Sequence, residues 1–360
     1  MSKLLPLACA AFLCAASSMA YAAPPEGEPP PSYTPAERAL AAGAAIVPGA
    51  LVHGTGHLVL GETDTALRLL AAQGAGLVLM VGGIGLIAVT GASPTVISPL
   101  IGTVITGTGL FGVSALADLY GTLAPAGGFG TAPTRAPRLT AAVGYAYVQN
   151  PVFAYRHFTT ASAAARYHRF AAQPSLWLAA NDDNWRTTIP LQYRLIGPHA
   201  DADTHGGDLL QFTLAASHHR YGTEGFSQTL GELSATGRID LHPYGRTLQG
   251  SYAELTLGAA YGANHYDQLA TESTSLILGG FAFGMYLGRG AGEARLYYDH
   301  RHDDYAAGLK SIGLGSGVPG HFGASIHTTL YGPWGLDAGY EIGSAHVARA
   351  ALTYRYGDSP

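Results

Sequence analysis

Two histidines near the N-terminus have the spacing of metal ligands. His53 and His57 are four residues apart, so on a helix both imidazoles would project from one face, as in many zinc sites. Gly54 and Gly56 weaken any helix at this point. A capping or hydrogen-bonding role for the two histidines is therefore the alternative, and the two glycines favour it.

The densest polar cluster is the segment 299–304. On a strand, His300 and His302 would point the same way, and Asp304 follows two residues later. Imidazole and carboxylate ligands suit a divalent ion. The cluster also lies where a strand would end in a loop, and a solvated loop tip is the alternative. We assign the chain no metal and no cofactor, and keep these three residues, with His53 and His57, as metal candidates.

Two serine–histidine pairs have the residue types of nucleophilic catalysis, which needs a serine, a histidine base and an acidic or amide partner. Ser217 and His219, with Glu224, form one set, and Ser325 and His327 form the other. The members of each pair are two residues apart, so they share one face of a strand. Neither pair has the sequence context of a known hydrolase family. We therefore assign no catalytic residue and keep the two pairs as candidates.

The N-terminus has the pattern of a secretory signal peptide. Lys3 supplies a positive charge, an apolar run follows from Leu4 to Ala16, and Ala20-Tyr21-Ala22 offers a cleavage site between small residues. The run is too short to span a bilayer. We expect residues 1–22 to be a signal peptide that is removed on secretion.

Composition excludes several classes of function. Cys9 and Cys14 both lie in the expected signal peptide, so the mature chain would contain no thiol, no thiolate metal site and no disulfide. Charged residues make up 12% of the chain, against about a quarter in ordinary soluble domains. Without Lys3, 18 basic and 24 acidic residues leave a net charge of −6. Such a chain has no general attraction for nucleic acid.

The region before residue 138 changes from proline-rich to apolar. Residues 23–36 are rich in proline and predict an extended linker, with a helix beginning near Thr34. Residues 37–128 predict an apolar helical hairpin, because no charged residue lies between Arg68 and Asp118 and two apolar stretches, about 66–90 and 95–119, each exceed the ~20 residues that span a bilayer. The stretches would approach each other through glycines, namely Gly74, Gly82, Gly85, Gly102, Gly107 and Gly109. Whether this hairpin enters lipid, lies in the periplasm or packs on the barrel stays open.

After a Gly, Pro and Thr-rich linker, the hydrophobic period changes to two, which is typical of half-buried strands. The clearest alternation is in the segments Leu210–His219, Glu232–Leu241, Tyr252–Tyr261, Glu293–Arg301 and Ala348–Tyr356. Weaker alternation is found in Leu139–Val148, Ala161–Phe170, Trp185–Ile196, Ser275–Leu287, His321–Tyr331 and Trp334–Ile342, with Ser175–Ala180 doubtful. Segments of about ten residues can cross a bilayer when tilted. We predict a mainly β fold, an antiparallel transmembrane β-barrel of 10–12 strands over residues 138–356. A soluble sandwich or lipocalin-like barrel is the alternative.

The last segment resembles the C-terminal signal of Gram-negative outer-membrane barrels. In 349–356, Arg349 is followed by a small residue and then by Tyr354 and Tyr356 at alternate positions. Ala351 stands where the family usually has glycine, and four residues follow the last tyrosine. The resemblance implies an outer-membrane location, contact with outer-membrane lipid and insertion by the barrel assembly machinery.

A second resemblance covers Pro48 to Ala66, where Pro48-Gly49, Gly56-His57 and Gly61 match a signature that precedes small bacterial membrane hairpins. It implies a hairpin and adds no chemistry.

Together these patterns predict a passive channel or a structural component of the envelope. Its lumen would be lined by charged residues, namely Glu232, Arg238, Glu254, Arg295 and Arg355, whose mixed signs could instead close it by ion pairing. The alternative is a lipid-modifying outer-membrane enzyme of the phospholipase or lipid A deacylase type. An envelope-spanning tether is disfavoured, because the segment 120–137 reaches only about 60 Å when extended. The oligomeric state and any solute are not predicted.

Overall fold

A computed structural model describes residues 32–91, 96–151, 153–201, 206–306 and 320–357. The expected signal peptide and most of the expected linker lie outside these residues. The chain divides into two compact units. One contains the chain up to residue 132 with residues 237–255 and 280–289, and the other contains 133–236, 256–279 and 290–360. Each is described by itself below.

The described residues of the first unit contain four α-helices, namely α2 (Pro35–Ile46), α3 (Thr55–Val59), α4 (Thr63–Thr90) and α5 (Ile97–Leu123). Helix α2 begins where the sequence predicts. The Thr34 hydroxyl accepts a hydrogen bond from the Glu37 backbone N–H at 3.3 Å, and the Glu37 carboxylate accepts one from the Thr34 N–H at 2.7 Å. This reciprocal capping box satisfies two N–H groups that the helix itself cannot bond.

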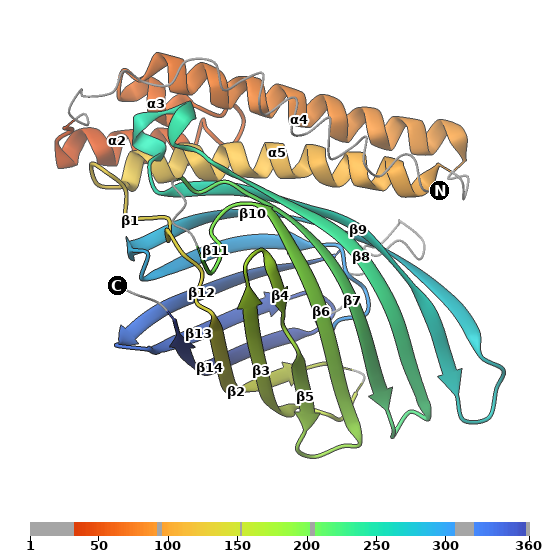
Figure 1. Ribbon diagram of the computed structural model, residues 1–360. Coiled ribbons are helices and arrows are strands. Elements are labelled where there is room, and N and C mark those ends of the chain that lie inside the picture. The colour runs from red at the N-terminus through yellow and green to blue at the C-terminus, as the bar shows by residue number, and fades with distance from the viewer. Residues whose placement is uncertain (1–31, 92–95, 152, 202–205, 307–319, 358–360) are drawn as a thin grey trace. The chain divides into compact units, whose positions relative to one another are not determined.

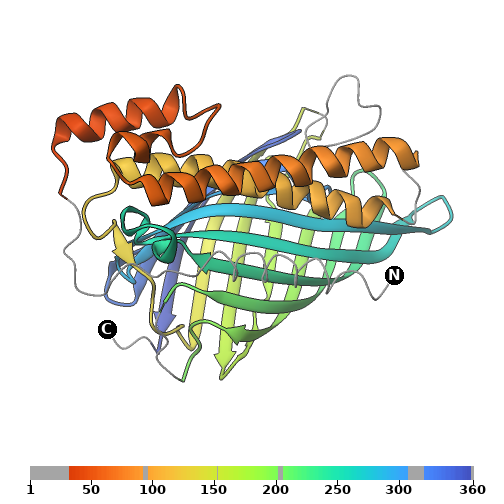
Figure 2. The same cartoon turned by 90° about the horizontal axis from the view of Figure 1, so that it is seen from above.

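Helices α4 and α5 are long and apolar enough to cross a membrane and pack side by side (Figure 2). They are antiparallel, because Gly76 lies against Gly107 and Phe111 whereas Gly83 lies against Val104. A Cβ atom on Gly107 would stand 2.5 Å from the Met80 backbone nitrogen, so only glycine allows this approach.

The prediction of which glycines face the partner helix is wrong for four positions. Gly109 of α5 lies against Phe281 and not against α4. Gly74, Gly82 and Gly85 of α4 have no atom within 4 Å of an added Cβ, so they do not contact α5. At 100° per residue, Gly76 and Gly83 fall on one side of α4 and these three glycines fall on the other. Helical phase, rather than glycine content, decides which residues meet.

Within the same unit, α5 packs on the ends of three strands. The buried cluster joins Ala117 and Tyr120 of α5 to Leu241, Ala253 and Phe283. Tyr120 also donates a hydrogen bond of 2.7 Å to the Gln249 carbonyl. The strand residues that α5 covers lie on the face opposite to Arg238 and Glu254, which is the apolar face that the alternation predicts.

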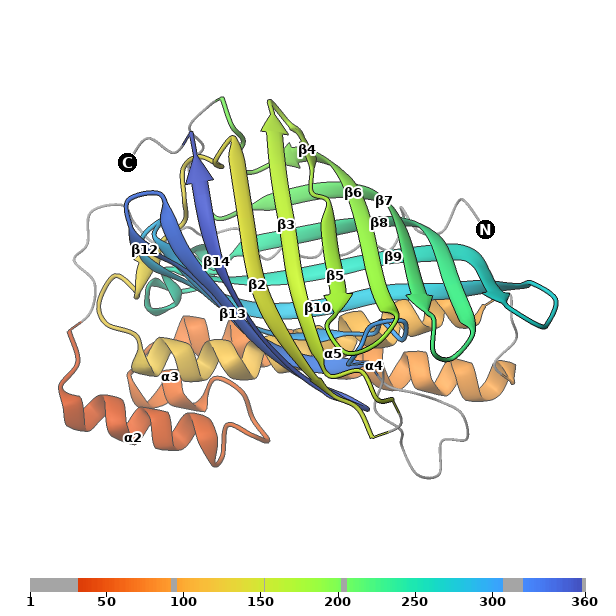
Figure 3. The same ribbon diagram turned by 90° about the horizontal axis from the view of Figure 1, so that it is seen from below.

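The strands form one sheet whose neighbours follow in chain order (Figures 1 and 3). They are β1 (Gly130–Thr131), β2 (Leu139–Gln149), β3 (His157–Tyr167), β4 (Phe170–Ala172), β5 (Ser175–Ala179), β6 (Asn184–Ile196), β7 (Leu209–Tyr221), β8 (Phe226–Asp240), β9 (Ser251–Tyr266), β10 (Glu272–Arg289), β11 (Gly292–Asp299), β12 (His321–Tyr331), β13 (Trp334–Ile342) and β14 (His346–Tyr356). Short 3-10 turns η1 (His242–Tyr244) and η2 (Arg246–Leu248) join β8 to β9. The first and last long strands, β2 and β14, are antiparallel neighbours, and the β9–β10 pairing closes the ring.

Twelve strands form the closed barrel, with β4 and β5 counted as one interrupted strand and β1 as a short parallel addition to β10. This confirms the predicted antiparallel barrel of 10–12 strands. The interruption is at Gln173-Pro174, where proline has no N–H for the ladder. The doubtful segment Ser175–Ala180 is thus a true strand, paired with β3 and β6.

One predicted strand is displaced. The sequence segment Ala161–Phe170 is not continuous, because β3 begins earlier, at His157, and ends at Tyr167. The chain turns at His168, which has a φ of 50°, and Phe170 already belongs to β4. Histidine is not a typical turn residue, so the alternating pattern in the sequence predicts one strand that continues across the turn.

Side chains on the two faces of the barrel differ sharply in chemistry. Large apolar residues on one face stay exposed, for example Val143 (65%), Leu214 (59%) and Leu352 (51%). Their strand neighbours on the other face include buried polar residues such as Gln211 and Thr353. A soluble barrel has the opposite arrangement, whereas an apolar exterior and a polar interior are typical of barrels in lipid.

Candidate functional site

A buried charged network forms where the segment 300–306, which follows β11, contacts strands on the far side of the ring. Arg301 is held by Glu232 of β8, and Arg186 of β6 is held by Asp303 and Asp304. Because β6 and β8 are not neighbours of β11, these contacts can only be made through the interior of the barrel. We call this segment with its partners the latch.

Arg301 is the centre of the latch. Its Nη1 and Nη2 donate to the two Glu232 carboxylate oxygens at 2.9 and 2.6 Å. Its Nε and Nη2 donate to Asp303 at 2.7 and 2.9 Å. Two bidentate ion pairs on one guanidinium satisfy the geometry that arginine prefers. Ser217 adds a hydrogen bond of 3.1 Å to Glu232.

Arg186 supplies the second cation. It is 3.5 Å from the Asp303 carboxylate and forms a close ion pair with Asp304. Burial alone would raise the pKa of the Asp304 carboxyl, but the guanidinium groups of Arg186 and Arg301 outweigh it and hold the pKa well below its usual range. Asp304 is therefore ionised at neutral pH.

Aromatic packing holds the same segment from the other side. Tyr305 donates a hydrogen bond of 2.8 Å to Asn184, and its ring stacks on Trp177 at 5.3 Å and contacts Phe158 at 4.6 Å. Ala306 accepts a backbone hydrogen bond from Ala345 at 3.1 Å. The segment thus contacts β3, β5 and β6 as well as the β13–β14 turn, which is the arrangement of a loop folded across a lumen.

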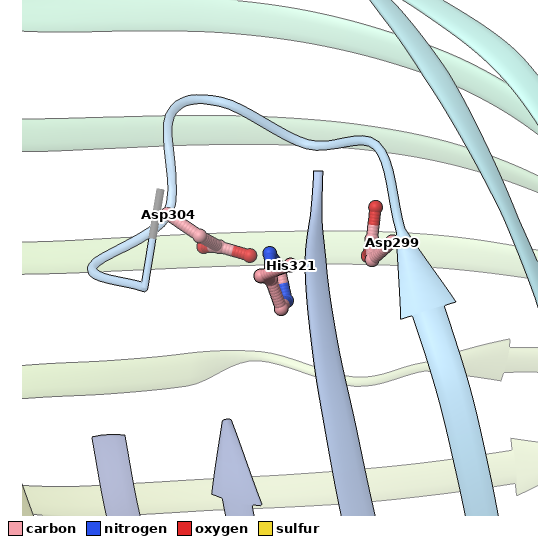
Figure 4. Close-up of side chains that lie close together, drawn as sticks. All are labelled: Asp299, Asp304 and His321. Atoms are coloured by element: carbon pink, nitrogen blue, oxygen red, sulfur yellow. The ribbon is translucent and has the colours of Figure 1, made fainter. Parts of the chain in front are cut away.

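Asp304 also belongs to a second cluster (Figure 4). Asp299 at the end of β11 is the cross-strand partner of His321 at the start of β12. Asp299, Asp304 and His321 each place a ligand atom within 4.8 Å of those of the other two. Among the described residues this is the only such group of three.

The five residues proposed from sequence to line the lumen make different contacts. Glu232 belongs to the latch, and Arg238 donates to Glu254 at 3.0 and 2.9 Å. Arg238 also lies over the ring of Tyr252 at 3.8 Å. Arg295 lies 5.5 Å from the centre of the Tyr297 ring, and Arg355 donates to the Thr329 hydroxyl at 3.3 Å.

The structure does not bring the candidate serines and histidines into catalytic contact within the described residues. Ser217 is hydrogen-bonded to Glu232, whereas His219 is bonded to Asn184 at 3.1 Å. His327 lies 3.8 Å from Asp337, and the cross-strand partners of Ser325 are Arg295 and Gly339. The geometry therefore provides no serine activated by a histidine base in this part of the chain.

The N-terminal histidines have hydrogen-bonding partners instead of a shared ligand set. Asp118 accepts from His57 Nδ1 at 2.6 Å and from the backbone N–H groups of Gly54 and Gly56 at 2.9 and 3.2 Å. His53 Nδ1 lies 2.7 Å from the Ser114 hydroxyl. These bonds fasten the turn before α3 to α5.

His300 and His302 do not form a group of metal ligands with Asp304. Their rings lie 4.7 Å apart, and His300 is bonded to the Tyr298 hydroxyl at 2.9 Å. Burial and the neighbouring His302 lower the pKa of His300 to about 4, so it is neutral at pH 7. Asp304 points instead to Arg186, so the predicted His–His–Asp ligand set is not assembled.

Sequence analysis missed an arginine-lined pocket at the opposite end of the barrel, where the chain enters β2. Arg166 donates to the Pro137 carbonyl at 3.1 Å, Arg169 donates to the Leu195 carbonyl at 2.8 Å, and Arg194 donates to Gln211 at 3.0 Å. No Asp or Glu lies among the described residues that line this pocket. Arg194 and Arg186 lie on the inward face of the same predicted strand, Trp185–Ile196. Assigning the two faces of that strand from its alternation would have identified both arginines as lumen-facing.

No protein-family model matches the sequence, and no curated protein matches it. The barrel does match solved outer-membrane proteins. A KdgM porin in complex with disordered oligogalacturonate aligns with 60% of this chain and 99% of its own, at 6% identity and a TM-score of 0.38. Omp33 of Acinetobacter baumannii aligns with 62% of this chain and 100% of its own, at 7% identity and a TM-score of 0.33. The translocator domain of the autotransporter NalP from Neisseria meningitidis aligns with 61% of this chain and 88% of its own, at 15% identity and a TM-score of 0.34. At these scores, nothing that those proteins bind carries over to this chain.

Proposed function

We propose that this protein is an outer-membrane channel whose conducting path is narrowed by the latch. The location is supported by the exposed apolar face of the barrel strands, which suits outer-membrane lipid. The resemblance of 349–356 to the C-terminal barrel signal supports insertion by the barrel assembly machinery. Fractionation of membranes with a heat-modifiability gel tests this part, because a closed barrel runs faster before boiling.

One observation carries the functional proposal, namely that Arg301 and Arg186 bind carboxylates through the barrel interior. A segment fixed in that position reduces the cross-section open to solutes. The ion pairs are buried, so they are little screened by salt and keep the segment in place under physiological conditions. The wild-type protein is then a channel of low conductance for small solutes.

Planar-bilayer recording of the purified full chain tests the proposal. Arg301→Ala removes the central cation of the latch, and we expect the single-channel conductance to rise several-fold. The matched control is Arg220→Ala, which breaks an exposed ion pair with Asp183 near the β5–β6 turn. Exposed pairs contribute little, so conductance should stay at the wild-type value.

Either of two results would overturn the channel proposal. If neither wild type nor Arg301→Ala conducts, the barrel has no path and the protein is a structural component of the envelope. If Arg220→Ala and Arg301→Ala raise conductance equally, the latch does not control the path. Hydrolysis of phospholipid or lipid A by the wild-type protein would instead favour a lipid-modifying enzyme.

A further inference from the structure

The cluster of Asp299, Asp304 and His321 has the ligands of a metal ion but is surrounded by other charges, so its charge balance decides what it can bind. Among the described residues, four carboxylates meet at this end of the lumen, from Asp299, Asp303, Asp304 and Glu232. Two guanidinium groups, from Arg186 and Arg301, face them, and a third, from Arg349, is balanced by Glu341 at 3.0 Å. Within the described part of the chain, four negative charges less two positive charges leave an excess of two. Uncompensated buried charge is strongly unfavourable, and one divalent cation would balance it.

His321 provides an independent sign of a missing ligand. It is 2% exposed, and its Nδ1 atom is enclosed without a hydrogen-bond partner among the described residues. Buried polar atoms are nearly always bonded, so an enclosed imidazole nitrogen without a partner needs an explanation. Figure 4 shows the ring of His321 beside the carboxylate of Asp304.

Asp299 retains the capacity to bind a cation. Its Oδ1 accepts a hydrogen bond of 3.0 Å from the Arg301 backbone N–H, and no other hydrogen bond to its carboxylate is found within the described residues. Asp299 and His321 are fixed on paired strands, so two of the three ligands are held by the sheet. Asp304 comes from the latch, and its second oxygen lies 3.9 Å from Arg301.

We propose that Asp299, Asp304 and His321 bind one divalent transition-metal ion of the Zn²⁺ class. One imidazole with two carboxylates favours such ions, whereas Mg²⁺ and Ca²⁺ favour oxygen ligands alone. The bound ion would join the latch to the ends of β11 and β12. The site differs from the one that the sequence suggested, since it shares only Asp304 with that set.

Zn²⁺ titration of the full chain in detergent, after treatment with a chelator, tests the proposal. We expect one Zn²⁺ per chain, not displaced by excess Mg²⁺, and a Co²⁺ absorption spectrum with an imidazole ligand. Asp299→Asn and His321→Gln each remove one ligand and should weaken Zn²⁺ binding at least ~10-fold. A heat-modifiability gel establishes whether each variant is folded. If His321→Gln does not fold, Asp299→Asn alone is enough to test the site.

The matched control is the double variant His300→Gln/His302→Gln. It removes two neighbouring imidazoles that we exclude from the site, so Zn²⁺ affinity and the Co²⁺ spectrum should be unchanged. The proposal is wrong if wild type shows no saturable Zn²⁺ binding, if Asp299→Asn binds as tightly as wild type, or if only the His300/His302 variant loses the ion.

Discussion

The two ends of the barrel interior hold their arginines in different ways. At the latch, Arg186 and Arg301 bind carboxylates and are almost fully enclosed. At the end where β2 begins, Arg166 and Arg194 line a pocket and bond to neutral carbonyl, hydroxyl and amide oxygens. Carboxylate pairs hold the segment 300–306 in place, whereas the arginines of the pocket lie beside lining residues that include no Asp or Glu among those described. The same residue type thus has two different surroundings at the two ends.

Among the variants discussed, removal of Arg301 should have the largest effect on how firmly the latch is held. Arg301→Ala leaves Glu232 buried without its ion-pair partner and Asp303 with Arg186 alone, which costs about 3–5 kcal/mol. We expect residues 300–306 to lose protection in hydrogen–deuterium exchange, while the strands keep theirs. Arg220→Ala is the control, and equal protection of 300–306 in both variants would contradict the role of Arg301.

Acid should loosen the latch in a defined pH range. The pKa of Asp304 is lower in the folded protein than in the unfolded chain, so its ion pairs stabilise the latch above the unfolded value of about 3.9. This stabilisation is lost as the pH falls through the lower, folded value. The protection factor of 300–306, which removes the intrinsic pH dependence of amide exchange, should therefore fall as the pH is lowered from about 5 to 3.

The control for acid is Asp304→Asn, which removes the titrating group. The protection factor of its segment 300–306 should already be lower than that of wild type at pH 7, and its further fall between pH 5 and pH 3 should be smaller than in wild type. An acid response of wild-type size in this variant would assign the effect to other carboxylates.

Loss of one hydroxyl should have a smaller effect. Tyr305→Phe removes the hydrogen bond to Asn184 but keeps the ring packing on Trp177. A net loss of about 1 kcal/mol corresponds to roughly fivefold faster opening of the segment. Tyr331→Phe, at an exposed residue, should leave exchange unchanged. No difference between the two variants would mean that the hydroxyl does not hold the latch.

The arginine pocket should affect selectivity more than stability. Arg194→Gln removes one positive charge while keeping an amide donor towards Gln211. Stability should change by less than about 0.5 kcal/mol. In a salt gradient the reversal potential should shift towards lower anion preference. Arg289→Gln, outside the pocket, is the control; an equal shift there would show that total charge, and not the pocket, sets selectivity.

The barrel could be predicted from sequence because its signal is local. Alternation in Leu210–His219 corresponds to β7, Leu209–Tyr221, and the apolar set of 348–356 lies on the exposed face of β14. A strand in contact with lipid on one side and polar groups on the other must show its two faces in its own residues. The predicted ends of a strand are wrong where the turn contains no typical turn residue, as at His168.

The latch could not be predicted in the same way. The sequence predicts Asp304 as a metal-ligand candidate, with a solvated loop tip as the alternative. The loop-tip interpretation is wrong, since Asp304 and its neighbour Asp303 bind Arg186 inside the barrel. Arg186 is 118 residues from Asp304 in sequence, and Glu232 is 69 residues from Arg301. One sequence gives no register between segments so far apart, so such pairs become visible only when the ring is closed.

The cover of α5 on the strand ends imposes an order on assembly. Leu69 and Leu241 share one buried cluster but are 172 residues apart, and Phe283 of the same cluster comes later still. Contacts of this separation form late, after the loop between them has been ordered. The helices emerge from synthesis first, yet the strand residues that bury Ala117 and Tyr120 of α5 do not follow until β8, β9 and β10 have been made. The docking of α5 is therefore completed late, although the helix comes early along the chain.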